Sequence, residues 1–211
     1  MVSISMLVLS ILSAYLIGSL PTSFILANIF KGIDIRDAGS KNAGATNVLR
    51  TVGKIPAVIT LIVDVLKGVF AVTLAADFFY SFNIDLDYDF YRCLLGLVVV
   101  CGHIWSMFLK FKGGKGIATT LGVAIALAPK ILLPSAIVWI AVFSMANYVS
   151  LASILALISF PIISIIFNSS IYITVLSVIL CMISIYKHKE NIKRLIRGDE
   201  NKTYLFKKKS S

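Results

Sequence analysis

The sequence predicts an all-α fold: a polytopic bundle of seven transmembrane helices in a single domain, residues 1–211. Hydrophobic residues make up 58% of the chain and the mean hydropathy is +0.93, so most of the chain must lie in lipid or pack against it. The run from Ile131 to Tyr186 contains no Asp, Glu, Lys or Arg, and it is much longer than the roughly 20 residues that one bilayer crossing requires. The polar residues collect instead in three islands: Lys31 to Lys54, Phe108 to Thr120, and Tyr186 to Asn201.

The apolar segments follow one another along the whole chain. The first has no basic region before it and no small-residue cleavage pattern, so we expect a retained spanning helix. Pro21 removes a helix donor within it and should kink or end that helix. The fourth segment is short, since its helix would rise only about 20 Å against a hydrocarbon core of roughly 30 Å. The segments are Ser3 to Phe30, Ile55 to Phe79, Cys93 to Leu109, Ile117 to Pro129, Ile131 to Ala146, Tyr148 to Phe167, and Ile171 to Tyr186.

The basic residues sort to one side when these segments alternate across a membrane. The three islands and the C-terminal tail hold 17 of the 20 Lys and Arg residues. By the positive-inside rule the islands and the C-terminus are cytoplasmic and the N-terminus is outside. Six crossings would place the basic tail opposite the other two islands, which favours seven, although five crossings also satisfy the charges.

Several function classes are disfavoured by composition. Cys93, Cys101 and Cys181 have no paired spacing, and two histidines do not complete a zinc set with them, so neither disulfides nor a metal site is expected. The net charge of +10 comes without a basic patch interleaved with aromatic residues or a recognition helix, so we expect no nucleic-acid partner. Membrane topology explains the charge better.

The first island carries many small polar residues in the stretch AGSKNAGATN. Their backbone freedom and short hydroxyl and amide groups predict a concave anion-binding loop. Arg50 follows Thr46 by one helical turn and would add a bidentate charge to the same anion. An ordinary surface turn that caps the second apolar helix is the alternative. The candidate binding residues are Gly39, Ser40, Asn42, Gly44, Thr46 and Asn47, with Arg50.

The second island contains the run GGKG immediately before an apolar helix. Gly113, Gly114 and Gly116 around Lys115 predict backbone N–H groups and an ammonium that meet an anion at a helix N-terminus. The residue after the lysine is glycine, and not Ser or Thr, so a Walker A nucleotide site is not indicated. A flexible, positively charged loop is the alternative.

The third island, HKENIKRLIRGDE, has the pattern of a basic helix. His188, Asn191 and Leu195 share one face of that helix, and basic residues occupy the other sides. This face is the candidate site face, because it supplies an imidazole and an amide at a cytoplasmic membrane boundary. A basic helix end whose side chains snorkel to the membrane surface is the alternative.

Other polar residues lie within or between the apolar segments. Asp64 and Lys67 are three residues apart, and we expect them to pair inside the bundle as an architectural feature. His103 is expected to have a hydrogen-bonded packing role. Ser150 and Ser153 follow the predicted turn between the fifth and sixth segments and are secondary binding candidates, with a helix cap as the alternative.

The islands occur in the order GSLPTS, GIDIRDAGSKNAGATNVLR, FKGGKGIATTLG, YVSLASI and HKENIKRLIRGDE. Together they resemble the signature blocks of bacterial PlsY-type membrane acyltransferases. The resemblance implies a seven-helix enzyme of the bacterial cytoplasmic (inner) membrane, with its active site on the cytoplasmic side and no cofactor. Such an enzyme transfers a fatty acyl group from acyl phosphate to glycerol 3-phosphate, giving 1-acyl-glycerol 3-phosphate and phosphate, the first acylation in phospholipid synthesis.

Matching positions carry the family's functional residues onto this chain. The resemblance implies five of them: Ser40, Arg50, Lys115, His188 and Asn191. Two positions depart from the family's pattern. Lys41 stands where glycine is usual, and lysine tolerates a positive φ poorly. Asn147 stands where arginine is common.

Two anionic substrates require cations and an ordered loop rather than a metal. We expect acyl phosphate to contact Ser40, Thr46, Asn47 and Asn191, and glycerol 3-phosphate to contact Arg50, Lys115 and His188. The proton of the attacking hydroxyl goes either to His188 or to an oxygen of the acyl phosphate. The second is favoured, because the sequence offers no carboxylate next to a His–Ser pair of the triad kind.

A rival hypothesis and a partner follow from the same features. Anion-binding loops in a polytopic bundle also suit a transporter or channel for a phosphorylated solute. Against it, all three islands lie on one side and no inverted repeat is evident. The KKKSS terminus predicts a tail attracted to the membrane, and a soluble acyl-phosphate synthase that docks on the tail is a candidate partner.

Overall fold

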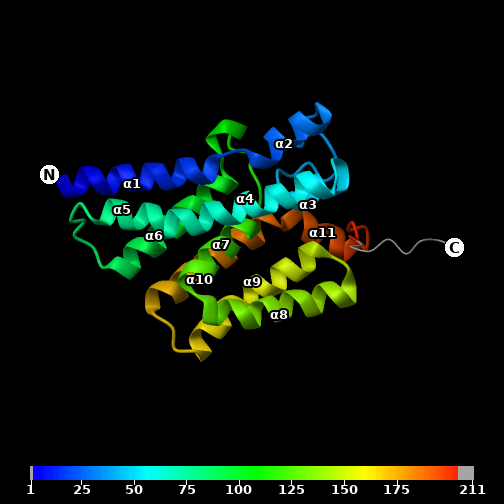
Figure 1. Ribbon diagram of the computed structural model, residues 1–211. Coiled ribbons are helices and arrows are strands. Elements are labelled where there is room, and N and C mark those ends of the chain that lie inside the picture. Colours follow the sequence, from blue (N-terminus) through cyan, green and yellow to red (C-terminus); the bar gives the residue numbers. More distant parts are fainter. Residues whose placement is uncertain (1, 204–211) are drawn as a thin grey trace.

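The computed structural model describes residues 2–203, and no β-strand occurs among them (Figure 1). The predicted all-α class is confirmed. The KKKSS terminus lies outside the described residues. The apolar runs form the long helices, because a segment in lipid must satisfy its backbone polar groups within itself. The elements are α1 Val2–Ser19, α2 Thr22–Lys31, α3 Ala45–Thr51, α4 Lys54–Val72, α5 Leu74–Tyr80, α6 Tyr88–Ile104, η1 Met107–Leu109, α7 Ile117–Leu127, α8 Pro129–Ala146, α9 Val149–Ile166, α10 Ile171–Lys187 and α11 Lys189–Arg197.

Each of the seven predicted apolar segments contains helix, but the segments differ in spanning length. Helices α10 and α11 meet at a bend of 59°, and they form one further span only if the pair is counted as a single broken helix. Helix α7 has only 11 residues. A helix of that length rises about 16 Å, roughly half of the hydrocarbon thickness. The seventh crossing therefore stays a prediction. Within residues 2–203 five helical segments are long and apolar enough to cross a membrane: Ile4–Lys31, Lys54–Tyr80, Tyr88–Leu109, Pro129–Ala146 and Val149–Ile166.

The first span is interrupted between α1 and α2 at Leu20 and Pro21, as proline predicts. The Leu20 carbonyl accepts a hydrogen bond from Lys67 Nζ at 2.6 Å, and the same ammonium lies 2.6 Å from Asp64 Oδ1. Both charged side chains are 3% exposed, so the expected pair inside the bundle is confirmed. The carboxylate of Asp64 and the Leu20 carbonyl both compensate the charge of Lys67, which makes buried charge tolerable at this position.

Two glycines hold the short helix α7 directly against α4. A Cβ at Gly68 would lie 2.3 Å from the Thr119 carbonyl oxygen, and a Cβ at Gly122 would lie 2.0 Å from that of Val65. Membrane helices use such contacts because small residues let two backbones approach closely, and close packing drives their association in lipid. The contact fixes α7 and therefore the GGKG loop that precedes it.

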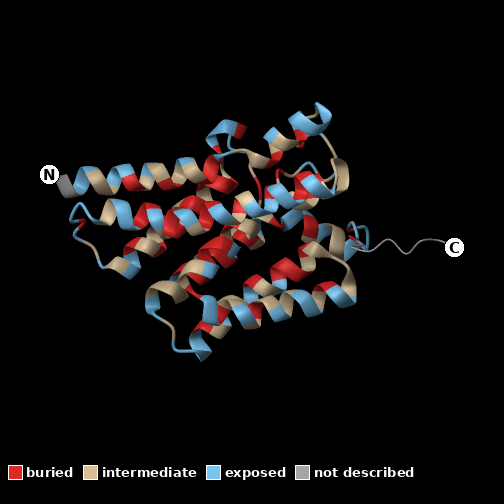
Figure 2. Cartoon of the chain, viewed as in Figure 1, coloured by how far each residue is buried: buried red, intermediate tan, exposed pale blue. Residues whose placement is uncertain are grey.

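Burial follows the inner faces of the helices, and the outer faces are exposed (Figure 2). Leu133, Ile137 and Ile140 on α8 are 69%, 66% and 59% exposed. An apolar surface of this kind is unfavourable in water and well solvated by acyl chains. The outward faces therefore identify the lipid-facing surface of the bundle.

Candidate active site

Side-chain contacts join the three polar islands, and α3 and α11 lie at the end of the bundle away from the N-terminus (Figure 1). Lys115 of the second island donates a hydrogen bond to Asn191 Oδ1 of the third. Arg50 of the first island donates from Nη2 to the Asn201 carbonyl at 2.9 Å and to Thr203 Oγ1 at 2.7 Å. Segments 76 and 151 residues apart in sequence therefore form one polar cluster, here called the loop cluster.

The first loop is organised around the side chain of Asn47, which is 1% exposed. Asn47 Oδ1 accepts the N–H of Ser40 at 2.8 Å. Its Nδ2 donates to the carbonyls of Ile35, Ala38 and Asn42 at 3.0, 2.9 and 3.1 Å. The expected contact between this amide and a substrate is therefore not supported, because all of its polar atoms serve the loop. Asn47 shapes the loop instead.

Two left-handed residues flank Ser40 in the same loop. Gly39 has φ 58°, and a Cβ there would lie 2.4 Å from Asn47 Oδ1. Lys41 has φ 57°, so the loop has the conformation in which a glycine is expected, although a lysine occupies the position. An L-residue in this region costs about 1–2 kcal/mol relative to a right-handed conformation. The loop therefore keeps its shape at some cost in stability.

The second loop packs against the end of α6. Gly113 and Gly114 donate their N–H groups to the carbonyls of Ile104 and His103, each at 3.1 Å. A Cβ at Gly114 would lie 2.2 Å from His103 Nε2, so glycine is required there for close approach. The sequence predicts that these two N–H groups bind an anion, whereas in the structure they fix the loop. Lys115 thus carries the anion-binding potential of this loop.

Lys115 is the electrostatic centre of the loop cluster. Burial holds the pKa of its ammonium down, to about 8, with Arg194, Arg50 and Lys187 lowering it further and the Glu200 carboxylate raising it. The ammonium is therefore still mostly protonated at neutral pH. A partly buried cation with few counter-charges is well placed to bind an anionic ligand.

Glu200 was not singled out from the sequence, and it joins the parts of the cluster. Its carboxylate is 2% exposed. Oε1 accepts hydrogen bonds from Asn191 Nδ2 at 2.9 Å and from Ser150 Oγ at 3.1 Å, and Oε2 accepts from Arg194 Nε at 2.8 Å. The available signal was an acidic residue, one turn beyond the helix, in an otherwise basic island. Asn191 lies between this carboxylate and Lys115, so its amide orients both.

His188 caps the end of α10 and is 2% exposed. Its Nδ1 lies 2.7 Å from the Ser184 carbonyl oxygen, which only a protonated Nδ1 can satisfy. Burial, then the Lys115 charge, hold the pKa of His188 down to about 4. The imidazole is therefore neutral at pH 7, with the lone pair on Nε2.

Arg50 is half-buried, and its Nε is a buried nitrogen without a partner in the described chain. Burial lowers the pKa of its guanidinium, and the nearby Glu200 charge opposes this. Its Nε is buried and makes no hydrogen bond within the described residues. A buried donor without an acceptor costs free energy unless a ligand satisfies it.

The remaining candidates are placed differently. Ser150 reaches the loop cluster through Glu200. Ser153 lies elsewhere: its hydroxyl accepts a hydrogen bond from Trp139 Nε1 at 3.2 Å, between α8 and α9. Gly116, with φ 85°, is the N-cap residue of α7, and Gly44 is the N-cap residue of α3. Four residues along the first loop are partly exposed: Ser40, Asn42, Gly44 and Thr46.

Residues 8–198, which include the chemistry-bearing positions from Ser40 to Asn191, match the family model for glycerol-3-phosphate acyltransferase. The chain belongs to the glycerol-3-phosphate acyltransferase family. A glycerol-3-phosphate acyltransferase of Desulforamulus reducens is 46% identical over 197 residues, with 92% of this chain and 94% of the relative covered. One of Fusobacterium nucleatum is 44% identical over 192 residues, with 91% and 95% covered.

Two crystal structures of PlsY (YgiH), an integral membrane glycerol 3-phosphate acyltransferase, share this fold. The glycerol 3-phosphate form aligns with a TM-score of 0.84 at 38% identity, covering 94% of this chain and 96% of that one. The lysophosphatidic acid form aligns with a TM-score of 0.81 at 37% identity, covering 94% and 95%. The resemblance in the signature blocks is confirmed, and the chain is an integral membrane acyltransferase of this family.

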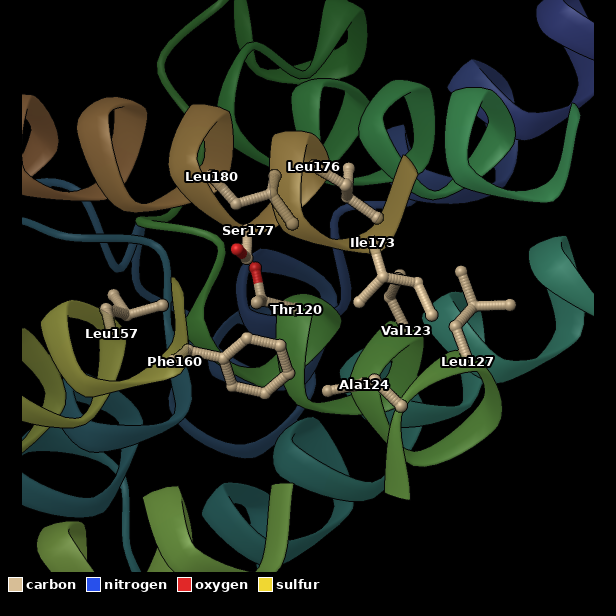
Figure 3. A pocket seen from close by; sticks show the side chains of 11 residues that line it. Thr120, Val123, Ala124, Leu127, Leu157, Phe160, Ile173, Leu176, Ser177 and Leu180 are labelled. Carbon is tan, nitrogen blue, oxygen red and sulfur yellow. The ribbon is translucent and has the colours of Figure 1, made fainter. Parts of the chain in front are cut away.

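This member of the glycerol-3-phosphate acyltransferase family has an apolar groove between α7, α9 and α10 (Figure 3). It holds about 370 Å³ of empty space, including the part open to its surroundings. The hydroxyls of Thr120 and Ser177 point toward one another inside it. Since α7 begins just after Lys115 and α10 ends just before His188, the groove lies between helices that carry the loop cluster. Its lining consists of Thr120, Val123, Ala124, Leu127, Ala128, Leu157, Phe160, Ile173, Leu176, Ser177 and Leu180.

Proposed function

We propose that this chain transfers a fatty acyl group from acyl phosphate to glycerol 3-phosphate, giving 1-acyl-glycerol 3-phosphate and phosphate. The observation that carries the proposal is the loop cluster, where the buried Glu200 carboxylate pairs with Arg194 and its charge also acts on Arg50 and Lys115, so three cations face one carboxylate. An excess of cations in a half-buried site favours phosphate groups. The names of the relatives support glycerol 3-phosphate as the acceptor, and the apolar groove suits a fatty acyl chain.

The two substrates are both phosphate anions, so the site must offset their repulsion. Two unit charges 4 Å apart interact by about 4 kcal/mol at an effective dielectric constant of 20. We assign the phosphate of glycerol 3-phosphate to Arg50 and Lys115, whose charges oppose this repulsion. The head group of the acyl phosphate then lies along the partly exposed edge of the first loop, at Ser40 and Thr46. Asn191 orients Lys115 and does not bind the phosphate by itself.

The reaction forms one bond and breaks one. A hydroxyl oxygen of glycerol 3-phosphate attacks the acyl carbon, the new ester C–O bond forms, and the bond from that carbon to the phosphate oxygen breaks. The electron pair leaves with the phosphate. We propose that the released phosphate also takes the hydroxyl proton, because a base with a pKa of about 4, such as His188, is poorly matched to neutral pH. The mixed anhydride is already activated, so positioning supplies much of the rate.

Replacement of His188 distinguishes the two proton paths. If His188 only positions groups through Nε2, His188→Gln should keep at least about a tenth of the parent kcat at saturating substrates. Loss of general base catalysis would reduce kcat by roughly 10²–10⁴-fold. A loss of that size in a folded protein would therefore assign the proton to His188.

We propose seven crossings of the bacterial cytoplasmic membrane, with the N-terminus outside and the loop cluster cytoplasmic. The support is the basic charge of the three islands. Lys41→Cys, in the exposed part of the first loop, tests it. Labelling by a membrane-impermeant maleimide should occur in inside-out vesicles and not in intact cells, after the native cysteines are replaced. Labelling in intact cells would reverse the orientation.

Purified protein with chemically defined donors tests the activity itself. Palmitoyl phosphate with glycerol 3-phosphate should give lysophosphatidate and one equivalent of phosphate. Palmitoyl-coenzyme A and palmitoyl-acyl carrier protein should give none. Product from either thioester but not from palmitoyl phosphate would refute the donor, and no product from any donor would refute the enzyme hypothesis.

A further inference from the structure

The segment Asp199–Thr203, here called the C-terminal strap, returns the chain across the loop cluster after α11. Gly198 turns the chain with φ 78°. Glu200 anchors the start of the strap through its buried carboxylate, described above. Thr203 anchors the end, since its N–H donates to the Asn147 carbonyl at 2.9 Å. The strap therefore connects α11 to the corner between α8 and α9.

Between these two anchors the strap meets Arg50. The Asn201 carbonyl and the Thr203 hydroxyl both accept from Nη2 of the guanidinium, at 2.9 and 2.7 Å. Nε of the same guanidinium is buried and has no partner in the described chain. The strap thus holds one nitrogen of the guanidinium, and the hydrogen-bonding capacity of Nε is unused.

The chemical nature of the two acceptors matters. A carbonyl and a hydroxyl are neutral, so they fix the guanidinium without neutralising its charge. A carboxylate in their place would compete with a phosphate for the same cation. Arginine has many rotamers, and a side chain that is already fixed loses less entropy when it binds.

We infer that the strap positions Arg50 for phosphate, with Thr203 as a positioning residue that acts through its hydroxyl. The inference rests on the proposed function, because it assumes that Arg50 contacts the phosphate of glycerol 3-phosphate. Nothing in the sequence pattern pointed to Thr203, which lies beyond the signature blocks and beyond the matched residues 8–198.

The test is steady-state kinetics on variants of the full chain with palmitoyl phosphate as donor. Thr203→Val removes the hydroxyl and keeps the shape of the side chain. We expect a rise in KM for glycerol 3-phosphate of roughly fivefold, with kcat within about twofold, because one of two hydrogen bonds to a charged group is lost. Thr203→Ser should restore the parent KM.

Thr73→Val is the matched control for loss of a threonine hydroxyl. Thr73 donates to the Val69 carbonyl at 2.7 Å, at the junction of α4 and α5, and its replacement should leave KM unchanged. A double-mutant cycle with Arg50→Ala completes the test, because Thr203→Val should have no further effect on KM once Arg50 is absent.

The outcomes separate the inference from the proposed function. If Arg50→Ala itself leaves KM unchanged, the proposed role of Arg50 fails. If Arg50→Ala raises KM but Thr203→Val does not, the positioning role of Thr203 is wrong. A fall in KM for Thr203→Val would show that the strap competes with the substrate, which also overturns the inference.

Discussion

Replacement of Glu200 perturbs the loop cluster at the residue that joins most of it. The carboxylate accepts from Asn191, Ser150 and Arg194 at 2.9, 3.1 and 2.8 Å. Removing one partner of a buried ion pair costs about 3–5 kcal/mol. Arg194 is 30% exposed, so the low end applies to Glu200→Ala. Glu200→Gln keeps an acceptor oxygen but loses the charge, and we expect about 2 kcal/mol, since charge-assisted hydrogen bonds are about twice as strong as neutral ones.

Thermal unfolding in one detergent measures the effect. For a chain of this size 1 kcal/mol shifts the melting temperature by about 2–4 °C, so Glu200→Gln should melt about 4–8 °C below the parent. The Glu200 charge also raises the pKa of Lys115. Loss of the Glu200 charge should lower the pKa of Lys115 and therefore move the alkaline limb of kcat/KM for glycerol 3-phosphate to lower pH. Asp199→Asn, at the exposed neighbouring carboxylate, is the control. Equal melting temperatures and pH profiles for the two variants would refute the role of Glu200.

Three further predictions concern the two glycine-bearing loops. For the parent, kcat/KM for glycerol 3-phosphate should fall above a pH of about 8, because Lys115 then loses the charge that attracts the phosphate. Lys115→Arg should extend activity to higher pH. An alkaline limb identical in the parent and in Lys115→Arg would contradict this. Lys41→Gly should stabilise the protein by up to about 1 kcal/mol, since relief of the left-handed strain exceeds the entropy cost of glycine; a lower melting temperature would show that Lys41 is unstrained. Asn47→Ala removes the hydrogen bonds that shape the first loop. It should lower the free energy of unfolding by about 3 kcal/mol and raise KM for palmitoyl phosphate. Parent-like values of both quantities would contradict the role of Asn47 in shaping the loop.

Periodicity and spacing could predict the features that depend on neighbouring residues. Apolar runs gave the helices, Pro21 gave the break between α1 and α2, and the three-residue spacing of Asp64 and Lys67 gave their pair. The class of enzyme followed from the signature blocks. The seventh crossing depends on how α7 sits in a bilayer, which neither its length nor the fold determines.

Features that depend on tertiary contact could not be predicted. The direction of the Asn47 amide depends on carbonyls brought close by the loop itself. The use of the Gly113 and Gly114 N–H groups depends on the position of the end of α6. Glu200 becomes a buried acceptor only because Gly198 turns the chain back over Asn191. For Asn47 and the two glycines the residue type was informative, but the partner that each contacts could not be predicted.

We propose that Arg50 and Lys115, from separate loops, hold one phosphate. The most direct test is KM for glycerol 3-phosphate in Arg50→Ala and Lys115→Ala, with Lys112→Ala, an exposed lysine of the same loop, as control. We expect KM to rise by about tenfold or more in the first two variants, because each loses a charged hydrogen bond worth about 1.5–3 kcal/mol, and to stay at the parent value in the control. Parent-like KM values in folded, active Arg50→Ala and Lys115→Ala would contradict the shared phosphate site.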